Sequence, residues 1–267
     1  MRNDDEEKRA ILFSMMVFSV SLFAYKKHVV VSRHVAMRHR LRMEDFVKQN
    51  FVYMHQRSNL RSRVGYAFNH KNFIHLTSNM VLMYLFGRDL VEDARVSWKQ
   101  FGEITIASAV AATVTHRKPV PMIGASGIVM GLLGSLALLD PNKTWMLVLP
   151  IPGVPVTNLQ IAQGILVSHF VAISLRLRMA SRYALMGHVG GLLAGGACVV
   201  AAGLADIKRS RSDMFESIDY WRKTFNCTGL VLYWFLLSVQ IPFRSGSVKG
   251  ELLTKQRLIE RSLDDQY

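Results

Sequence analysis

Long runs of apolar residues alternate with segments rich in Lys and Arg along this chain of 267 residues. Seven of these runs contain neither Lys nor Arg. A helix needs roughly 20 mostly apolar residues to cross a hydrocarbon core of about 30 Å, so each run predicts a membrane-spanning helix, although the first three are short. The predicted spans are residues 11–25, 73–86, 101–115, 120–139, 156–175, 183–205 and 224–241.

The polar segments between these runs give the chain its predicted organisation. We expect an all-α, polytopic membrane bundle with a six-span core and a seventh, C-terminal span. The long first loop carries 11 Lys or Arg residues and small apolar patches, which predicts short amphipathic helices at the membrane interface. The predicted segments are a polar N-terminal segment at 1–10, a core at 11–205 that includes the first loop at 26–71, a basic linker at 206–223, the extra span at 224–241 and a polar tail at 242–267.

Composition narrows the classes of function. Half of the residues are hydrophobic and only 19% are charged, yet the formal net charge is +14. Because the Lys and Arg residues lie between the apolar runs, we assign them to anionic lipid headgroups rather than to nucleic acid. Both cysteines lie in or beside apolar runs, which argues against a disulfide framework. Neither a CxxC nor an HExxH motif occurs, so no metal or other cofactor is expected.

Three predicted spans carry polar residues that a bilayer makes costly to bury. His75 and Asn79 share one face of the second span, Ser126 lies in the fourth, and His188 lies in the sixth. A serine needs an adjacent base to be nucleophilic at neutral pH, and a tetrahedral oxyanion needs preorganised donors. The glycines around Ser126 and His188, taken alone, are explained by close helix packing. Together the three spans offer one nucleophile, one base and a set of N–H donors.

Three short motifs carry these polar residues in a fixed order. They read His75-Leu-Thr-Ser-Asn79, Gly124-Ala-Ser-Gly127 and His188-Val-Gly-Gly191. This arrangement resembles the rhomboid family of intramembrane serine proteases, whose pattern is HxxxN in one span, GxSG two spans later and HxxG two spans after that. The resemblance covers residues 64–204, and its specificity lies in the combination of the three motifs.

The resemblance implies that Ser126 is the nucleophile and His188 its general base, in a dyad without an acidic third member. The sequence agrees, since neither Asp nor Glu lies near His188. The oxyanion would be held by the backbone N–H of Ser126 and by the side chains of His75 and Asn79. The supporting residues are Gly124 and Gly127 for the backbone turn, Gly191 for close packing of the sixth span on the fourth, and Met130, which replaces the family's common aromatic residue beside the catalytic histidine.

The remaining histidines receive structural assignments. His70 is expected to form structural hydrogen bonds, whereas His116 and His169 are expected to be packing or interfacial residues. The first loop lacks the family's Trp-Arg signature, because residues 26–71 contain no Trp. This departure and Met130 both resemble the mitochondrial, presenilin-associated branch of the family.

The primary hypothesis is a rhomboid-type serine endopeptidase that cleaves single-span membrane proteins within the lipid bilayer. The segment from Pro150 to Pro155 cannot continue a helix, so we expect a kinked or re-entrant approach to the fifth span and a hinge for a lateral gate. The alternative is a catalytically weak or inactive rhomboid-like subunit of a membrane-protein translocation or quality-control complex. A small-solute transporter would need more intramembrane charge than Glu103 provides. The oligomeric state is left open.

The distribution of charge bears on location. If the spans alternate strictly, the side that carries the first loop holds most of the Lys and Arg residues, which places that loop in the cytosol or matrix. Rhomboids of bacteria and of the secretory pathway typically place it outside, whereas the mitochondrial branch is thought to be inverted. That branch also has an extra span before its core, and this sequence shows one after it. We expect a multi-pass protein of the mitochondrial inner membrane rather than of the endomembrane system.

Overall fold

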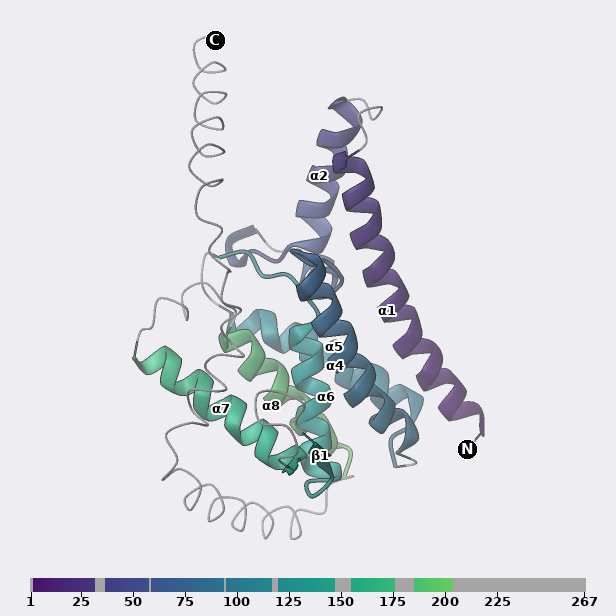
Figure 1. Ribbon diagram of the computed structural model, residues 1–267, viewed down its shortest axis with the longest axis vertical. Helices are drawn as coiled ribbons and strands as arrows, with labels where there is room; N and C mark the ends of the chain where they lie inside the picture. Colours follow the sequence, from purple (N-terminus) through teal and green to yellow (C-terminus); the bar gives the residue numbers. More distant parts are fainter. Residues whose placement is uncertain are drawn as a thin grey trace.

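A computed structural model describes residues 2–31, 37–57, 59–93, 95–116, 120–146, 155–175 and 185–203. This part of the chain is a bundle of α-helices with one small two-stranded sheet (Figure 1). The helices are α1 (Arg2–Val31), α2 (Met37–Phe51), α3 (Ser62–Gly65), α4 (Phe73–Glu92), α5 (Trp98–Thr115), α6 (Ser126–Leu139), α7 (Asn158–Ser174) and α8 (Leu185–Ala201), with 3-10 turns η1 (His55–Arg57) and η2 (Tyr66–Phe68) and strands β1 (Thr144–Met146) and β2 (Pro155–Thr157).

Each of the six predicted core spans corresponds to a helix, but several boundaries differ. Helix α1 is far longer than its apolar run, because acidic residues in its first turn and His28 in its last turn suit the helix dipole. Helix α6 starts at Ser126 rather than at 120, since Met122 pairs with Tyr53 in an isolated β-bridge. The predicted seventh span, the linker and the tail lie outside the described residues.

Length and composition alone mark only one span in the part of the chain that the structure describes. That span lies within α1, from Asp4 to His28, while α6 and α8 are apolar but shorter. The predicted first loop, 26–71, contains α2, α3 and the two 3-10 turns, while its first residues, 26–31, belong to α1.

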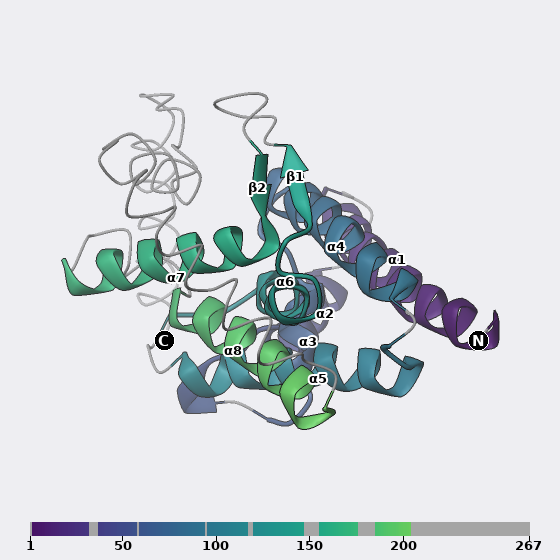
Figure 2. The same ribbon diagram turned by 90° about the horizontal axis from the view of Figure 1, so that it is seen from below.

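Helix α6 forms the centre of the bundle. Figure 2 looks along α6 and shows α4, α5, α7 and α8 around it, in agreement with the contacts between these helices. Most residues of α6 are buried. A Cβ added at Gly131 would collide with the Ser108 hydroxyl of α5, and one at Gly195 of α8 would collide with the Gly131 carbonyl oxygen. Small residues therefore let three helices meet at backbone distance.

Helix α1 lies along α4 and is tied down near both ends. The Lys8 ammonium donates to the backbone oxygen of Asp93 at 3.2 Å. The Lys26 ammonium, five turns later, donates to the side-chain oxygen of Asn69 and, at 3.4 Å, to the backbone oxygen of His70. Between these two ties Leu12 packs on Gly87, where an added Cβ would lie 2.7 Å from a Leu12 methyl group.

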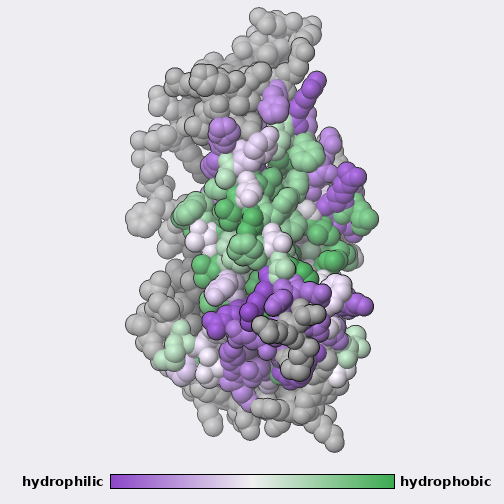
Figure 3. Space-filling model, turned by 90° about the vertical axis from the view of Figure 1, so that its right-hand side faces the viewer, coloured by the Kyte–Doolittle hydropathy of each residue, from purple (hydrophilic) through white to green (hydrophobic). Residues whose placement is uncertain are grey.

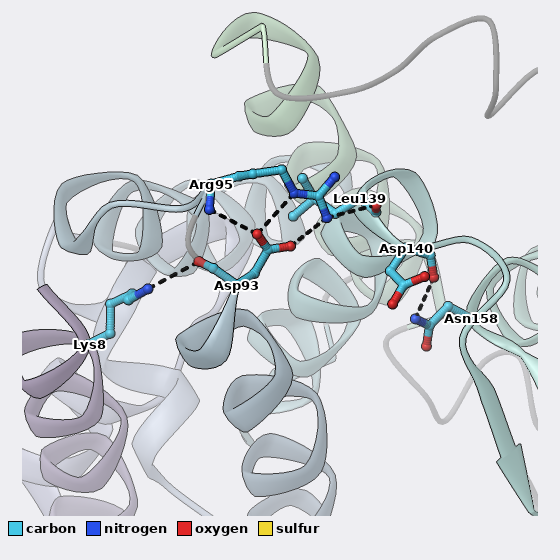
Figure 4. Close-up of polar contacts among 6 residues, drawn as sticks. All are labelled: Lys8, Asp93, Arg95, Leu139, Asp140 and Asn158. Carbon is cyan, nitrogen blue, oxygen red and sulfur yellow. Dashed lines mark hydrogen bonds and ion pairs between the residues drawn. The ribbon is translucent and has the colours of Figure 1, made fainter. Parts of the chain in front are cut away.

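A polar cluster lies at the C-terminal end of α6, opposite the end that carries Ser126 (Figure 4). The guanidinium of Arg95 makes two hydrogen bonds to the Asp93 carboxylate, at 2.9 and 2.6 Å, and one to the Leu139 backbone oxygen at 2.9 Å. Asn158 donates to the Asp140 backbone oxygen at 2.8 Å, which ties the start of α7 to the end of α6. The cluster thus links the α4–α5 connection, α6 and α7.

Strands β1 and β2 form an antiparallel pair just before α7, with Trp145 opposite Val156. The indole N–H of Trp145 donates to the Asn158 side chain at 2.6 Å. Residues 150–154 of the segment predicted to be a kinked or re-entrant approach lie outside the described residues, and Pro155, its last residue, begins β2.

The outer face that includes α1 has the surface expected of a membrane protein. Figure 3 shows a belt of hydrophobic side chains across this face, with hydrophilic residues above and below it. Helix α1 contributes several exposed large apolar side chains, among them Phe13, Val17, Phe18 and Val20. An apolar belt of this kind is costly in water and suits the acyl chains of a bilayer.

Candidate active site

Ser126 and His188 meet inside the bundle. The hydroxyl oxygen of Ser126, the first residue of α6, lies 2.8 Å from Nε2 of His188 in the first turn of α8. Both residues are half-buried. This distance is that of a good hydrogen bond, and it is the geometry that a serine nucleophile and its general base require.

A glycine contact fixes how closely these two residues approach. Gly191 of α8 packs on Gly127 of α6, and a Cβ added at Gly191 would collide with the Gly127 carbonyl oxygen. On its other side, a Cβ at Gly127 would lie 2.6 Å from the Tyr66 hydroxyl and 2.8 Å from the Ala112 methyl group. The two predicted supporting glycines therefore lie where any side chain would push the helices apart.

The turn before Ser126 depends on Gly124. Its φ is +107°, a conformation that residues with a side chain rarely adopt. A Cβ at this position would also lie 2.6 Å from Nε2 and Cε1 of His75 and 3.4 Å from the amide nitrogen of Asn79. The predicted donors His75 and Asn79 thus lie against the backbone two residues before Ser126.

The hydrogen bonds of His75 indicate which ring nitrogen carries its proton. The backbone N–H of Lys71 donates to Nδ1 at 3.5 Å, so the proton of the neutral ring lies on Nε2, the nitrogen beside Gly124. Asn79 is buried and donates one of its two amide protons to the His75 backbone oxygen at 2.9 Å. The N–H of Ser126 lies in the first turn of α6, at the positive end of the helix dipole.

His169 of α7 forms a further link behind His188. Its Nε2 lies 3.0 Å from Nδ1 of His188, and its own Nδ1 lies 3.3 Å from the Ser168 hydroxyl oxygen. That hydroxyl lies 2.9 Å from the backbone oxygen of Ile165. His169 is buried, as a packing residue would be, and both of its ring nitrogens are hydrogen-bonded, one of them to His188.

His70 anchors the segment that leads into Ser126. Its Nε2 accepts a hydrogen bond from the Ala125 backbone N–H at 3.4 Å, and its Nδ1 lies 3.2 Å from the Phe68 backbone oxygen. Burial, together with the nearby His75 and Lys26, lowers the pKa of His70 to about 4. The ring is therefore neutral at physiological pH, as an acceptor must be, which fits the structural role predicted for it.

The other predicted residues have simpler surroundings. His116 is buried and its Nε2 lies 2.8 Å from the Val120 backbone oxygen. Met130 lies one turn after Ser126 on α6 and packs, half-buried, against the core. Within the described ranges no group of three or more His, Cys, Asp or Glu residues could hold a metal ion. The chemistry of the site is that of a hydroxyl, imidazoles and N–H donors.

Two comparisons with known proteins bear on this site. The model of the Rhomboid domain matches residues 57–205. A curated protein of Saccharomyces cerevisiae, "Rhomboid protein 1, mitochondrial", is 33% identical over 102 residues, which cover 34% of this chain and 29% of that protein. The chain thus spans under a third of the length of this relative. The two matches support the predicted location in a mitochondrial membrane. Because the Rhomboid domain covers more than half of the chain, including all the helices that carry the site, the protein belongs to the rhomboid family of membrane proteins.

Proposed function

We propose that this protein is an intramembrane serine protease that hydrolyses a peptide bond in or near a transmembrane helix of its substrate. Ser126 is the nucleophile and His188 the general base. The observation that carries this proposal is the hydrogen bond of 2.8 Å between the Ser126 hydroxyl and Nε2 of His188, formed between two apolar helices. Membership of the rhomboid family supports the same reaction class.

The reaction proceeds in two halves. In the first, the Ser126 oxygen bonds to the carbonyl carbon of the scissile peptide while its proton passes to Nε2 of His188. Collapse of the tetrahedral intermediate breaks the C–N bond, and His188 returns the proton to the leaving amine. In the second half, water attacks the acyl carbon and passes a proton to His188. The bond between that carbon and the Ser126 oxygen then breaks, and His188 returns the proton to Ser126 as the acid product leaves.

The negative charge on the intermediate requires preorganised donors. We assign this role to Nε2–H of His75, to the amide of Asn79 and to the backbone N–H of Ser126. The close approach of His75 and Asn79 to Gly124 supports this assignment, because it brings both side chains to the turn that precedes the nucleophile. The positive end of the α6 dipole adds to the stabilisation.

The expected substrate is a single-span membrane protein whose helix unwinds locally, since a hydrogen-bonded helix shields its carbonyl groups. We place substrate access beside α7. This helix packs less extensively on the bundle than α8 does, and Phe170 on it is 71% exposed. The proline-rich segment before α7 is the proposed hinge.

We further propose that α1 and α4 to α8 are six membrane spans, that residues 224–241 form a seventh, and that the protein lies in the mitochondrial inner membrane.

The decisive experiment compares the wild-type protein with Ser126→Ala and His188→Ala. We expect the purified wild-type chain to cleave a model single-span substrate in liposomes and to be labelled by a fluorophosphonate, and both variants to do neither. Undiminished cleavage by Ser126→Ala would refute the proposal.

The second candidate is a catalytically weak or inactive rhomboid subunit of a translocation or quality-control complex. Met130, in place of the family's common aromatic residue, and the first loop without Trp favour it. The same probe separates the two candidates, because only an activated serine reacts. An unlabelled, folded wild-type protein would support the second.

A further inference from the structure

We propose that His169 is a positioning residue for the reaction, which holds His188 in the tautomer that a general base needs. This inference rests on the proposed function of Ser126 and His188. It adds a residue from a third helix, α7, to the pair formed by α6 and α8. The evidence is a continuous chain of hydrogen bonds from the Ile165 backbone oxygen to the Ser126 hydroxyl.

The direction of every hydrogen bond in this chain follows from its last member. A backbone oxygen can only accept, so the Ser168 hydroxyl donates its proton to Ile165. The Ser168 oxygen then accepts from Nδ1–H of His169. A neutral imidazole with its proton on Nδ1 has a free acceptor on Nε2.

The same reasoning continues to the nucleophile. Nε2 of His169 accepts from Nδ1–H of His188, at 3.0 Å. The proton of neutral His188 therefore lies on Nδ1, and its Nε2 is free to accept the Ser126 proton, at 2.8 Å. The Ile165 carbonyl thus sets, through Ser168 and His169, the one tautomer in which His188 can act as the base.

A neutral histidine suits this position better than the carboxylate of a serine protease triad. An ionised carboxylate is costly to bury among apolar helices, and neither α7 nor α8 contains Asp or Glu. The imidazole of His169 orients His188 by accepting a hydrogen bond from its Nδ1–H, and it introduces no permanent charge. When His188 becomes an imidazolium during the reaction, Nε2 of His169 still accepts the hydrogen bond from Nδ1–H of His188.

The test uses the full-length chain and two substitutions of His169. His169→Gln keeps an acceptor at the reach of Nε2, whereas His169→Leu keeps similar volume but has no acceptor. Loss of a whole general base costs about 10²- to 10⁴-fold. We therefore expect His169→Leu to lower kcat about 10- to 100-fold with an unchanged KM, and to lower the rate of fluorophosphonate labelling by a similar factor. His169→Gln should recover most of both.

A matched control and a parallel reference make the result decisive. Ile106→Leu, at an exposed apolar position of α5, a helix that carries no residue of the proposed site or access route, should match wild type in kcat and in its thermal unfolding midpoint. Ser126→Ala, assayed in parallel, tests the proposed function itself. If Ser126→Ala is inactive but His169→Leu matches wild type, the role of His169 is refuted while the proposed function stands. If Ser126→Ala remains active, the proposed function fails first.

Packing alone gives a different pattern of results. An apolar leucine would then be tolerated at least as well as a polar glutamine, and equal losses in both variants with lowered unfolding midpoints would overturn the proposal. Should His169→Leu fail to fold, Ser168→Ala supplies the test. It should lower kcat in the wild-type background and have a smaller effect in the His169→Gln background, where the tautomer of residue 169 no longer matters. Equal effects in both backgrounds would refute the chain.

Discussion

Gly191 of α8 lies directly on Gly127 of α6, with no side chain between the two backbones. The contact lies one residue after Ser126 and three residues after His188. The spacing between Ser126 and His188 is therefore set by the absence of two side chains, and it is carried by helices rather than by loops.

Gly191→Ala should impair both activity and stability. The new methyl group would collide with the Gly127 carbonyl oxygen, so α6 and α8 must separate. Overpacking costs about 1–3 kcal/mol, and a misplacement of about 1 Å at an active site can cost roughly 100-fold in rate. We expect a lower thermal unfolding midpoint in detergent and a loss of kcat of at least about tenfold.

Gly102→Ala on α5 is the matched control, because a Cβ there meets nothing within 4 Å. Alanine in a helix is about 0.5–1 kcal/mol more favourable than glycine, so this variant should keep its activity and unfold at the same or a higher temperature. Identical behaviour of the two alanine variants would show that close packing at Gly191 is unimportant.

Gly124→Ala should abolish most activity. The substitution combines a strained positive φ, which costs about 1–3 kcal/mol, with a contact of 2.6 Å between the new methyl group and the His75 ring. Gly203→Ala shares the positive φ, at +67°, but meets no atom within 4 Å. We expect both variants to lose some stability and only Gly124→Ala to lose cleavage, measured as kcat. Cleavage at the wild-type rate by Gly124→Ala would contradict the position given to His75.

Asn79→Leu should separate catalysis from stability. The substitution removes the amide donor while keeping a buried side chain of similar size. Loss of one oxyanion donor costs about 10²- to 10³-fold in kcat, so we expect a loss of that order with little change in KM or in unfolding midpoint. Ser78→Ala, at the exposed neighbour, should behave as wild type. A change confined to KM would assign Asn79 to substrate binding instead.

The ion pair between Asp93 and Arg95 should make the free energy of unfolding depend on pH. Burial alone would raise the pKa of the Asp93 carboxyl, but the hydrogen bonds and charge of Arg95 outweigh it and leave the pKa below its usual 3.8. A pKa lowered by folding means that the ion pair stabilises the protein above the unfolded pKa and that this contribution is lost as the pH falls through the folded value.

Asp93→Asn is the variant that tests this dependence. Thermal unfolding should show it less stable than wild type at pH 7, and the difference should shrink as the pH drops below about 4. A difference that stays constant down to pH 2 would mean that the carboxylate contributes by packing alone.

The helices could be predicted from the sequence because apolar runs between charged segments define them locally. The starts of helices were harder, since they depend on distant residues. Residues 120–125 are as apolar as a span, yet pairing of Met122 with Tyr53 and the positive φ of Gly124 delay α6 until Ser126. The proximity of His75 and Asn79 was predictable because both lie four residues apart on one helix.

The role proposed for His169 could not be predicted from the sequence. It depends on how α7 is rotated and tilted against α8. His169 and His188 are 19 residues apart in the sequence, and no local pattern fixes how their two helices pack. A usable signal was the cost of burying imidazoles in an apolar bundle, which favours pairing them with one another when no acid is nearby. The absence of Asp and Glu near His188 is visible in the sequence, whereas the neutral side chain that faces His188 instead is visible only in the structure.

The attachment of α7 gives it the properties of a lever. The helix is fixed near its first residue, where Asn158 bonds to the end of α6, and His169 lies 11 residues along it, a lever arm of roughly 16 Å at 1.5 Å per residue. A tilt of about 10° would move His169 by roughly 3 Å, which is enough to break its hydrogen bond to His188. A protease built in this way would lose the orientation of its base whenever α7 leans outward to admit a helix and regain it only on closure, so its active state would be tied to the fit of the occupant.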